Sequence, residues 1–463
     1  MLTRQDYFAI INNIPLDKRG GLLMGWKKCQ KRYVKKRKGK GLFWKKEWNK
    51  PCCIVLTSLL IVFCISYCYT YISIASASLS KKIVGSHMRG MTVSLASFKQ
   101  TSENEYTMNI GNRKRAISTL LPFLQDAAVN LFQQYRIPVG AVVALDPSTG
   151  AILAMASQGD NPLNHRLPLA LSSSYPAASI FKLVTLSAAL ERETIHPDDI
   201  LKAAKRLKYD GKWIQDSSNV PTGPISVGNA LAKSCNTAFA TMAIDVGYPC
   251  LEKYAERFGF NSKLCPDIPV EESTANISDE TYDIAASGAG FGDINMSPLH
   301  GALLAASIAN KGQIMEPTLI KQIVDAEGRV LVTPSPQVMR TPITPETAEI
   351  IKTMMIQTVH GEGNAHKAFY DRRGNPYLQG IKIAGKTGSL SCKSQPKNCT
   401  WFVGFAPADN PEIAIAVLIV NYDTWRVKAC TVTRKLLEAY FEGKDKKSTL
   451  HMVNKQHVRD VES

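Results

Sequence analysis

A serine and a lysine three residues apart, in the run Ser179-Ile180-Phe181-Lys182, have the types and spacing of a nucleophile and its base. Residues three apart share one face of a helix, so the Lys182 amine would lie beside the Ser179 hydroxyl. A serine hydroxyl is a poor nucleophile without an adjacent base. A lysine can serve as that base once its pKa falls through desolvation or a neighbouring cation. The pattern makes Ser179 a candidate nucleophile and Lys182 its candidate base.

Two further short patterns follow in order along the chain. The tripeptide Ser234-Cys235-Asn236 could supply a hydroxyl for proton relay and an amide that holds a substrate carbonyl. The run Lys386-Thr387-Gly388-Ser389, on a strand edge, would offer a cation, hydroxyls and an uncluttered backbone to a peptide lying alongside. Each pattern is weak alone, because S-x-x-K and S-x-N recur elsewhere in the chain. The prediction of a shared site depends on the order of the three patterns and on the helix or strand where each one lies.

The hydrophobic pattern indicates the strands and helices that must position these residues. Two β-prone runs within 139–157 are joined by Asp-Pro-Ser-Thr-Gly, a strong hairpin signal. Helical spacing covers the ranges 117–135, 176–192, 225–312 and 431–441. Further strands are predicted at 380–390 and 399–421, the latter with a turn at 408–411. This arrangement predicts an α+β domain, in which one antiparallel sheet is assembled from distant segments and helices pack on it.

The ordered trio and its surrounding segments resemble the transpeptidases of the penicillin-binding proteins. The likeness covers the chain from about residue 115 to 440. The matching runs are GAVVALDPSTGAILAMAS, YPAASIFKLVTLSAALE, AKSCNTAFATMAIDVG, GAGFGDINMSPLHGALLAASIANKGQIMEPTLI, KIAGKTGS and WFVGFAPADNPEIAIAVLIVN. The resemblance implies the penicillin-binding and serine β-lactamase-like fold, an antiparallel sheet flanked by helices with a helical subdomain.

By this resemblance the chain would be a class B-like peptidoglycan D,D-transpeptidase that needs no cofactor. The nucleophile would attack the D-Ala–D-Ala bond of a stem peptide and pass the acyl group to a neighbouring peptide amine, and β-lactam antibiotics would mimic the donor. The implied catalytic residues are Ser179, Lys182 as general base, Ser234 and Lys386. The implied substrate-binding residues are Asn236, Thr387, Gly388 and Ser389, and the N–H groups of Ser179 and Ser389 would form the oxyanion hole.

Three features depart from the family pattern. Ala177 stands where many relatives carry glycine, and Cys235 is an unusual middle residue, for which a buried, inert thiol is the expected state. Residues 76–114 are too few for a glycosyltransferase domain. The chain therefore looks like a minimal, single-activity form, and a separate glycosyltransferase is a candidate partner.

Basic residues are concentrated in the first 51 residues, which hold fifteen Lys/Arg against three Asp/Glu, in a chain of net charge +17. The uncharged apolar run 52–75 follows, and as a helix it would rise about 36 Å, enough to cross a bilayer. A basic block beside an apolar block indicates a membrane rather than nucleic acid. The positive-inside rule places the N-terminus in the cytoplasm and everything after Ala75 outside it.

The predicted organisation has five parts along the chain. They are a basic cytoplasmic segment at 1–51, a transmembrane helix at 52–75, an extracytoplasmic linker at 76–114, a transpeptidase domain at 115–442 and a charged tail at 443–463. The expected location is the cytoplasmic (inner) membrane, crossed once, with the catalytic domain on the periplasmic side.

Six cysteines would lie outside the membrane, where disulfides persist. Six cysteines allow fifteen full pairings, and the sequence does not choose among them. The favoured pairs are Cys392–Cys399, which could close a hairpin, and Cys250–Cys265. A metal site has little support, because no C-x-x-C occurs and the eight histidines are scattered.

Residues 380–387 also match the phosphate-loop pattern G-x-x-x-x-G-K-[ST]. That motif should follow a strand and open a helix, whereas alternating Ile381 and Ile383 put the segment itself in a strand. The phosphate-loop alternative therefore lacks its structural context.

Two alternatives that use the same acylation stay open. One is a hydrolase of the carboxypeptidase or β-lactamase type, and the other is a membrane β-lactam sensor. A sensor needs a cytoplasmic output domain, which a basic segment of about fifty residues hardly supplies. Between Lys182 and Ser234 the only glutamates are Glu191 and Glu193, and neither is an evident deacylating base.

Overall fold

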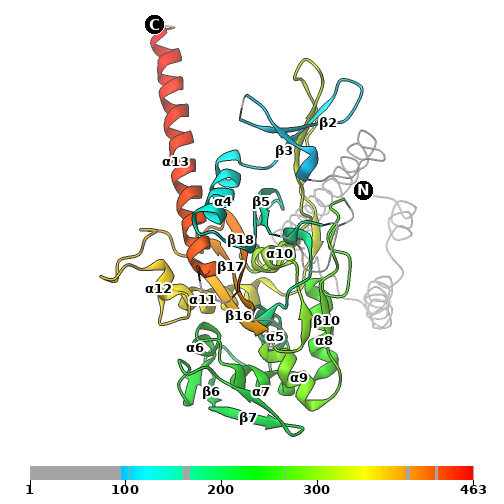
Figure 1. Cartoon of the computed structure of the whole chain (residues 1–463), viewed down its shortest axis with the longest axis vertical. Helices are drawn as coiled ribbons and strands as arrows, with labels where there is room; N and C mark the ends of the chain where they lie inside the picture. The colour runs from blue at the N-terminus through cyan, green and yellow to red at the C-terminus, as the bar shows by residue number, and fades with distance from the viewer. Residues whose placement is uncertain are drawn as a thin grey trace, which may run out of the picture. The chain divides into compact units, whose positions relative to one another are not determined.

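A computed structural model of the chain describes residues 95–102, 104–159, 167–265, 267–392, 397–422 and 426–461 (Figure 1). Its main sheet has the strand order β16-β17-β18-β4-β5, and every neighbouring pair is antiparallel. The strands are β4 (Val139–Leu145), β5 (Ile152–Gln158), β16 (Ala384–Cys392), β17 (Lys397–Ala406) and β18 (Ile413–Asn421). Leu418 on β18 lies opposite Ala141 on β4. The prediction of one antiparallel sheet built from distant segments is confirmed.

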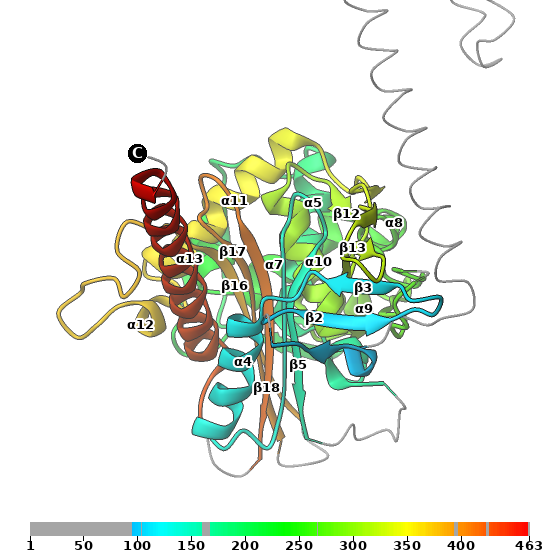
Figure 2. The same ribbon diagram turned by 90° about the horizontal axis from the view of Figure 1, so that it is seen from above.

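Helices cover both faces of this sheet, so β4 and β18 are buried along their whole length. Successive side chains point to opposite faces. Leu418 belongs to the core on the side of α10 (Pro298–Ala309), whereas Val417 belongs to the core on the side of α4 (Pro122–Gln134) and α13 (Ala429–Val461). Figure 2 shows α4 and α13 on one side of the strands and α10 on the other. Strands covered on both faces need near-continuous apolar runs, which VGAVVAL and IAIAVLIV provide.

The helices on the α10 side carry the predicted motifs. A 3-10 turn, η3 (Ala178–Ile180), leads into α5 (Lys182–Glu191), as the pattern at 176–192 predicts. The prediction that helices dominate residues 225–312 is confirmed, with short strands between some of them. The remaining helices are α6 (Val227–Ala232), α7 (Asn236–Val246), α8 (Tyr248–Phe258), α9 (Thr281–Ala289), α11 (Pro345–His360) and α12 (His366–Phe369).

A second five-stranded sheet differs from the prediction of a linker at 76–114. It has the order β1-β2-β3-β13-β14. Its strands are β1 (Lys99–Gln100), β2 (Tyr106–Asn109), β3 (Arg115–Ser118), β13 (Ile320–Val324) and β14 (Val330–Val332). The N-terminal strands are short and polar, and β3 gains its partner β13 from a distant segment. The hydrophobic pattern of a short segment does not reveal that it pairs with a distant strand.

Short elements complete the described chain. They are η1 (Leu95–Ser97), η2 (Leu169–Leu171), β6 (Ile200–Ala203) with β9 (Gly223–Ser226), β7 (Arg206–Tyr209) with β8 (Lys212–Gln215), β10 (Thr274–Asn276) with β11 (Asp293–Asn295), and β12 (Ile314–Met315) with β15 (Val338–Arg340). The helix predicted at 431–441 extends as α13 through most of the predicted charged tail.

The predicted membrane span at 52–75 lies outside the described residues. Within the part of the chain that the structure describes, none of the helices combines the length and the apolar composition that a bilayer crossing needs.

Candidate active site

Ser179 lies in η3, and two contacts hold the turn that precedes it. Trp401 Nε1 donates a hydrogen bond to the Pro176 carbonyl at 2.9 Å, and the Ala177 amide donates to the Ile294 carbonyl at 2.9 Å. Ala178 has a φ of 49°, a left-handed conformation that is costly for a residue with a side chain. The surrounding contacts stabilise this conformation, which places Ser179 at the start of the helical run.

The Lys182 amine lies at the centre of the cluster. Its Nζ is 2.8 Å from Ser179 Oγ, 3.2 Å from Ser234 Oγ and 2.7 Å from Asn236 Oδ1. The side chain is fully buried. Desolvation lowers the pKa of Lys182 to about 7, although the nearby Asp216 carboxylate acts to raise it. A neutral amine in this position can accept a proton from the serine.

Ser234 occupies the turn between α6 and α7, with a φ of 58° that is again left-handed. This turn places Ser234 Oγ between two amines, 3.2 Å from Lys182 Nζ and 3.0 Å from Lys386 Nζ. Asn236 begins α7, and its Nδ2 donates to the Gln215 carbonyl at 2.8 Å. A hydroxyl held between two amines can relay a proton.

Lys386 approaches the same hydroxyl from β16. Its side chain is fully buried, and its Nζ also donates to the Thr387 carbonyl at 2.7 Å. Burial lowers the pKa of Lys386 well below its ordinary value, and the Lys182 amine lowers it further. A proton on either amine therefore disfavours a proton on the other, and the two titrate as a pair.

Strand β16 is an edge strand of the main sheet and packs beside η3. Thr387 is half-buried and Ser389 is exposed, and side chains two apart on a strand share one face. Gly388 fits closely between its neighbours, since a Cβ there would lie 3.1 Å from Trp401 Cβ and 3.2 Å from Ile180 Cγ1. An exposed strand edge next to the nucleophile can bind an extended peptide as an added strand.

Asp216, which follows β8, is a site residue that the sequence patterns did not identify. Its carboxylate accepts hydrogen bonds from the Asn236 amide, from the Thr237 amide at 3.3 Å and from the Thr237 hydroxyl at 2.6 Å. The first N–H groups of a helix have no partner within the helix, so Asp216 caps α7 from a different element. No local motif marks this aspartate, because only the fold brings it to α7.

Gly290 is a second residue whose role the sequence did not reveal. It follows α9 with a φ of 88° and lies against the nucleophile turn. A Cβ at this position would lie 2.4 Å from the Ala178 carbonyl oxygen and 2.9 Å from the Ser179 nitrogen. The residue must therefore be glycine, both for its left-handed backbone and for its close approach to the site.

The structure explains both residue departures from the family pattern. Ala177 has φ and ψ of −63° and −22°, which any residue adopts, so glycine is not required there. Cys235 is fully buried, and its thiol donates to Asp216 Oδ2 at 3.2 Å. Burial raises the pKa of Cys235 to about 11, so the thiol stays protonated and inert, as expected.

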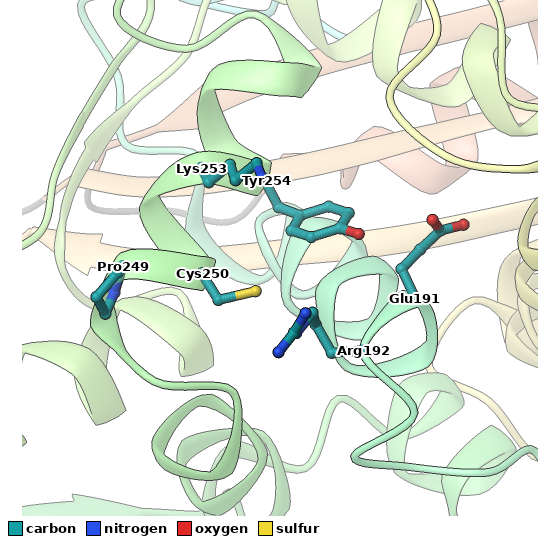
Figure 3. Close-up of a pocket in the computed structure, with 6 residues that line it drawn as sticks. All are labelled: Glu191, Arg192, Pro249, Cys250, Lys253 and Tyr254. Atoms are coloured by element: carbon teal, nitrogen blue, oxygen red, sulfur yellow. The ribbon is translucent and has the colours of Figure 1, made fainter. Parts of the chain in front are cut away.

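The structure corrects the predicted Cys250–Cys265 disulfide, because both thiols are free. Cys265 Sγ faces the Pro317 carbonyl at 3.8 Å, whereas Cys250 lines a cavity of about 320 Å³ beside Arg192 (Figure 3). The two thiols therefore face different neighbours rather than each other. This cavity lies at the C-terminal end of α5, the opposite end from Ser179.

The predicted Cys392–Cys399 pair falls on the β16–β17 hairpin. Cys399 lies opposite Leu390, and Cys392 lies opposite Lys397. Residues 393–396, between the strands, lie outside the described residues. The pairing stays a prediction.

Strand β16, which carries the third motif, begins later than the strand predicted at 380–390. Strand β16 starts at Ala384 rather than at 380, because the Ile383 amide donates to His360 Nε2 at 2.8 Å instead of to a neighbouring strand. Lys386 and Thr387 then lie within a strand and not at the start of a helix. This arrangement contradicts the phosphate-loop alternative.

Comparison with known proteins agrees with this geometry. The penicillin binding protein transpeptidase domain matches residues 140–438. The peptidoglycan D,D-transpeptidase PbpA of Mycolicibacterium smegmatis is 31% identical over 337 residues, which cover 65% of this chain and 66% of that protein. PbpA of Mycobacterium tuberculosis is 30% identical over 365 residues, which cover 70% of this chain and 72% of that protein.

A solved structure of penicillin-binding protein A from M. tuberculosis, a ceftriaxone acyl-enzyme complex, matches with a TM-score of 0.62 and 29% identity, covering 70% of this chain and 79% of that one. The matched regions contain the nucleophile turn, the α6–α7 turn and β16. The chain belongs to the penicillin-binding protein transpeptidase family.

Proposed function

We propose that the protein is a peptidoglycan D,D-transpeptidase that carries the acyl group on Ser179. The two PbpA relatives are named for this activity, and the solved relative is an acyl-enzyme. One observation supports the assignment of Ser179 as the nucleophile and Lys182 as its base. The buried Lys182 amine lies 2.8 Å from Ser179 Oγ, and burial lowers its pKa to about 7. This is the arrangement that a serine nucleophile needs.

The first step forms an ester and releases D-alanine. Ser179 Oγ attacks the carbonyl carbon between the last two D-alanines while Lys182 Nζ takes the hydroxyl proton. The bond to the terminal D-alanine nitrogen then breaks, and the leaving amine receives a proton through Ser234, whose hydroxyl also contacts Lys386. The Ser179 and Ser389 N–H groups would stabilise the oxyanion of the tetrahedral intermediate.

Substrate binding uses the strand edge and α7. The donor peptide lies along β16, where Thr387 and Ser389 bind the terminal carboxylate, and Gly388 lets the strand pack closely against Ile180 beside the nucleophile. Asn236 holds a peptide carbonyl on the side of α7.

The second step transfers the acyl group to a new amine. An amine from a neighbouring stem peptide attacks the ester carbonyl and loses a proton to Lys182. The amide bond forms as the bond between the carbonyl carbon and Ser179 Oγ breaks, and Lys182 returns the proton to Ser179 Oγ. A β-lactam enters at the first step instead, and its ring-opened ester keeps the leaving group attached.

The position of Glu191 favours a long-lived ester over rapid hydrolysis. Its carboxylate accepts hydrogen bonds from the Thr344 amide and hydroxyl, both at 2.8 Å, at the end of α5 opposite to Ser179. It therefore has no access to a water molecule that attacks the ester. This observation removes Glu191 as the candidate deacylating base of a β-lactamase-type hydrolase.

Intact-mass measurement of the detergent-solubilised full chain after benzylpenicillin treatment tests the assignment. The wild type should gain one stoichiometric, long-lived adduct. Ser179→Ala, which removes only the nucleophilic oxygen, should gain none. Rapid antibiotic breakdown without a lasting adduct would instead indicate a hydrolase. An adduct of equal size in both proteins would refute Ser179 as the nucleophile.

We further propose that residues 1–51 are a basic cytoplasmic segment, that residues 52–75 are a single membrane anchor, and that the transpeptidase domain at 115–442 lies outside the cytoplasm together with the preceding strands β1 and β2. The charge asymmetry around the apolar run supports this orientation. A separate membrane glycosyltransferase is the partner that would supply the glycan strands.

Fusions to alkaline phosphatase test the orientation, since that enzyme is active only outside the cytoplasm. A fusion after residue 94 should be active, and one after residue 48 should be inactive. The reverse pattern would contradict the proposed topology.

A further inference from the structure

The β7–β8 hairpin is fixed by its inner face. Ile214 packs into an apolar cluster with residues of α7 and α9. Tyr209 Oη lies 3.3 Å from Thr241 Oγ1, and the Asp210 carboxylate accepts a hydrogen bond from the Tyr282 amide at 2.7 Å. These contacts hold the hairpin rigidly against the helices that carry the second motif.

The outer face of the same hairpin is cationic and aromatic. Alternation along the paired strands places four exposed residues on it, which we call the hairpin face: Arg206, Lys208, Trp213 and Gln215. Trp213 is 49% exposed. The Arg206 guanidinium carbon lies 4.2 Å from the centre of the Trp213 ring, and Lys208 Nζ lies 5.7 Å from it. Both cations are therefore ordered around one indole in the free protein.

Neither cation is neutralised within the described part of the chain. None of the ion pairs there involves Arg206 or Lys208. A guanidinium that stacks on an aromatic ring keeps its N–H edges available, and those edges match a carboxylate in a two-pronged geometry. Because the stacking already orders the side chain, less conformational entropy is lost when an anion binds.

The hairpin face adjoins the catalytic cluster directly. Its terminal residue, Gln215, accepts a hydrogen bond from Asn236 Nδ2 at 2.8 Å through its carbonyl, and Asn236 Oδ1 contacts Lys182 Nζ at 2.7 Å. A long substrate that leaves the site on the side of Asn236 therefore meets Gln215 first and the Trp213 cluster next.

We propose that the hairpin face binds a carboxylate-bearing segment of the peptidoglycan polymer beyond the residues that react. The inference rests on the proposed function, because it extends the same substrate's contact surface. Stem peptides carry carboxylates that suit Arg206 and Lys208, and the apolar surface of the indole suits the ring of a sugar. A small β-lactam would not reach this face, whereas the polymer would.

Retention on purified sacculi tests this proposal with the full-length protein in detergent. Benzylpenicillin is added first, so that Ser179 is acylated in every sample. The Arg206→Gln/Lys208→Gln double variant and Trp213→Ala should each lose about tenfold in retention, as expected for central Arg and Trp contacts. Conversion of the sacculus carboxylates to amides, or added salt, should weaken wild-type retention similarly.

The matched control is Tyr377→Ala, because Tyr377 is 48% exposed and lies 4.0 Å from the Arg434 guanidinium carbon, in a different part of the fold. Its retention should equal that of the wild type. Equal retention of the double variant and the wild type, or retention that is indifferent to amidation, would overturn the proposal. Acylation of the wild type by benzylpenicillin tests the proposed function separately. The double variant changes only exposed side chains, so it still tests the proposal if Trp213→Ala fails to fold.

Discussion

Lys182 and Lys386 share the Ser234 hydroxyl at 3.2 and 3.0 Å, and both side chains are fully buried. Desolvation is the largest influence on each amine, and it lowers both pKa values. Asp216 acts in the opposite direction on Lys182, since its carboxylate favours the protonated amine. The aspartate thus has two effects on the site: it caps α7, and it raises the pH at which Lys182 becomes a base.

The rate constant for acylation by benzylpenicillin should rise with pH through about 7, as Lys182 loses its proton. Asp216→Asn removes a charge that raises the Lys182 pKa, so the midpoint of this rise should move to lower pH. A stopped-flow pH profile measures the midpoint. Asp210→Asn is the matched control, because Asp210 accepts a bond from an amide of another helix, α9, without acting on Lys182. An unmoved midpoint in folded Asp216→Asn would show that the aspartate acts only as a cap.

At the scale of elements, three separate segments meet at the nucleophile. The η3 turn carries Ser179, β16 packs beside it, and the end of α9 lies against its backbone. Ala178 in the η3 turn and Ser234 in the turn between α6 and α7 both have left-handed backbones. Such strain persists only where surrounding contacts hold it, and here it directs the two hydroxyls toward Lys182.

Gly290→Ala should disturb the site through this junction. The added methyl group would overlap the Ala178 carbonyl, so η3 must shift, and a displacement near 1 Å at a reacting group costs on the order of 100-fold in rate. Benzylpenicillin acylation should therefore slow by tenfold or more, as a progress curve of adduct formation would show.

Gly328→Ala is the control, because Gly328 has a φ of 82° but no neighbour within 4 Å of an added Cβ. Both substitutions should lower the unfolding free energy by roughly 1–2 kcal/mol for the left-handed backbone. Equal acylation rates in the two variants would contradict the positioning role of Gly290.

At the scale of the whole molecule, the buried amines reduce stability. In the unfolded chain a lysine stays protonated up to a pH of about 10.4. In the folded protein Lys182 is deprotonated above about 7. The unfolded state therefore binds more protons than the folded state between these two pH values. The free-energy cost of burying Lys182 is largest below a pH of about 7 and declines as the pH rises above it.

Lys182→Met should abolish acylation and raise the unfolding free energy at pH 7 by roughly 1–4 kcal/mol, since an apolar side chain of similar length suits a buried position. The stability difference between this variant and the wild type should narrow between pH 7 and pH 10. Urea unfolding at several pH values measures it. A difference that stays constant with pH would contradict the lowered pKa of Lys182.

Much of the fold follows from local patterns in the sequence. The alternating apolar runs around a turn at 146–150 predict the β4–β5 hairpin, and unbroken apolar runs predict strands that are covered on both faces. The order and spacing of the three motifs indicate the candidate site, because each motif lies on an element whose type the pattern also predicts. The structure brings Ser179, Lys182, Ser234, Asn236 and Lys386 into one hydrogen-bonded cluster.

Features that depend on contacts between distant segments were determined by the tertiary structure alone. The predicted linker contains β1 and β2, which join a sheet through β3, and β3 pairs with β13. A local sequence pattern does not reveal a strand partner that lies about two hundred residues away. Asp216 and Gly290 belong to the site only because β8 and α9 fold against α7 and η3. Cys250 and Cys265 are close in sequence but face different neighbours, so spacing alone predicted a bond that the fold does not make. Residue type and order determine which chemistry is available, whereas packing determines which groups meet and what their pKa values become.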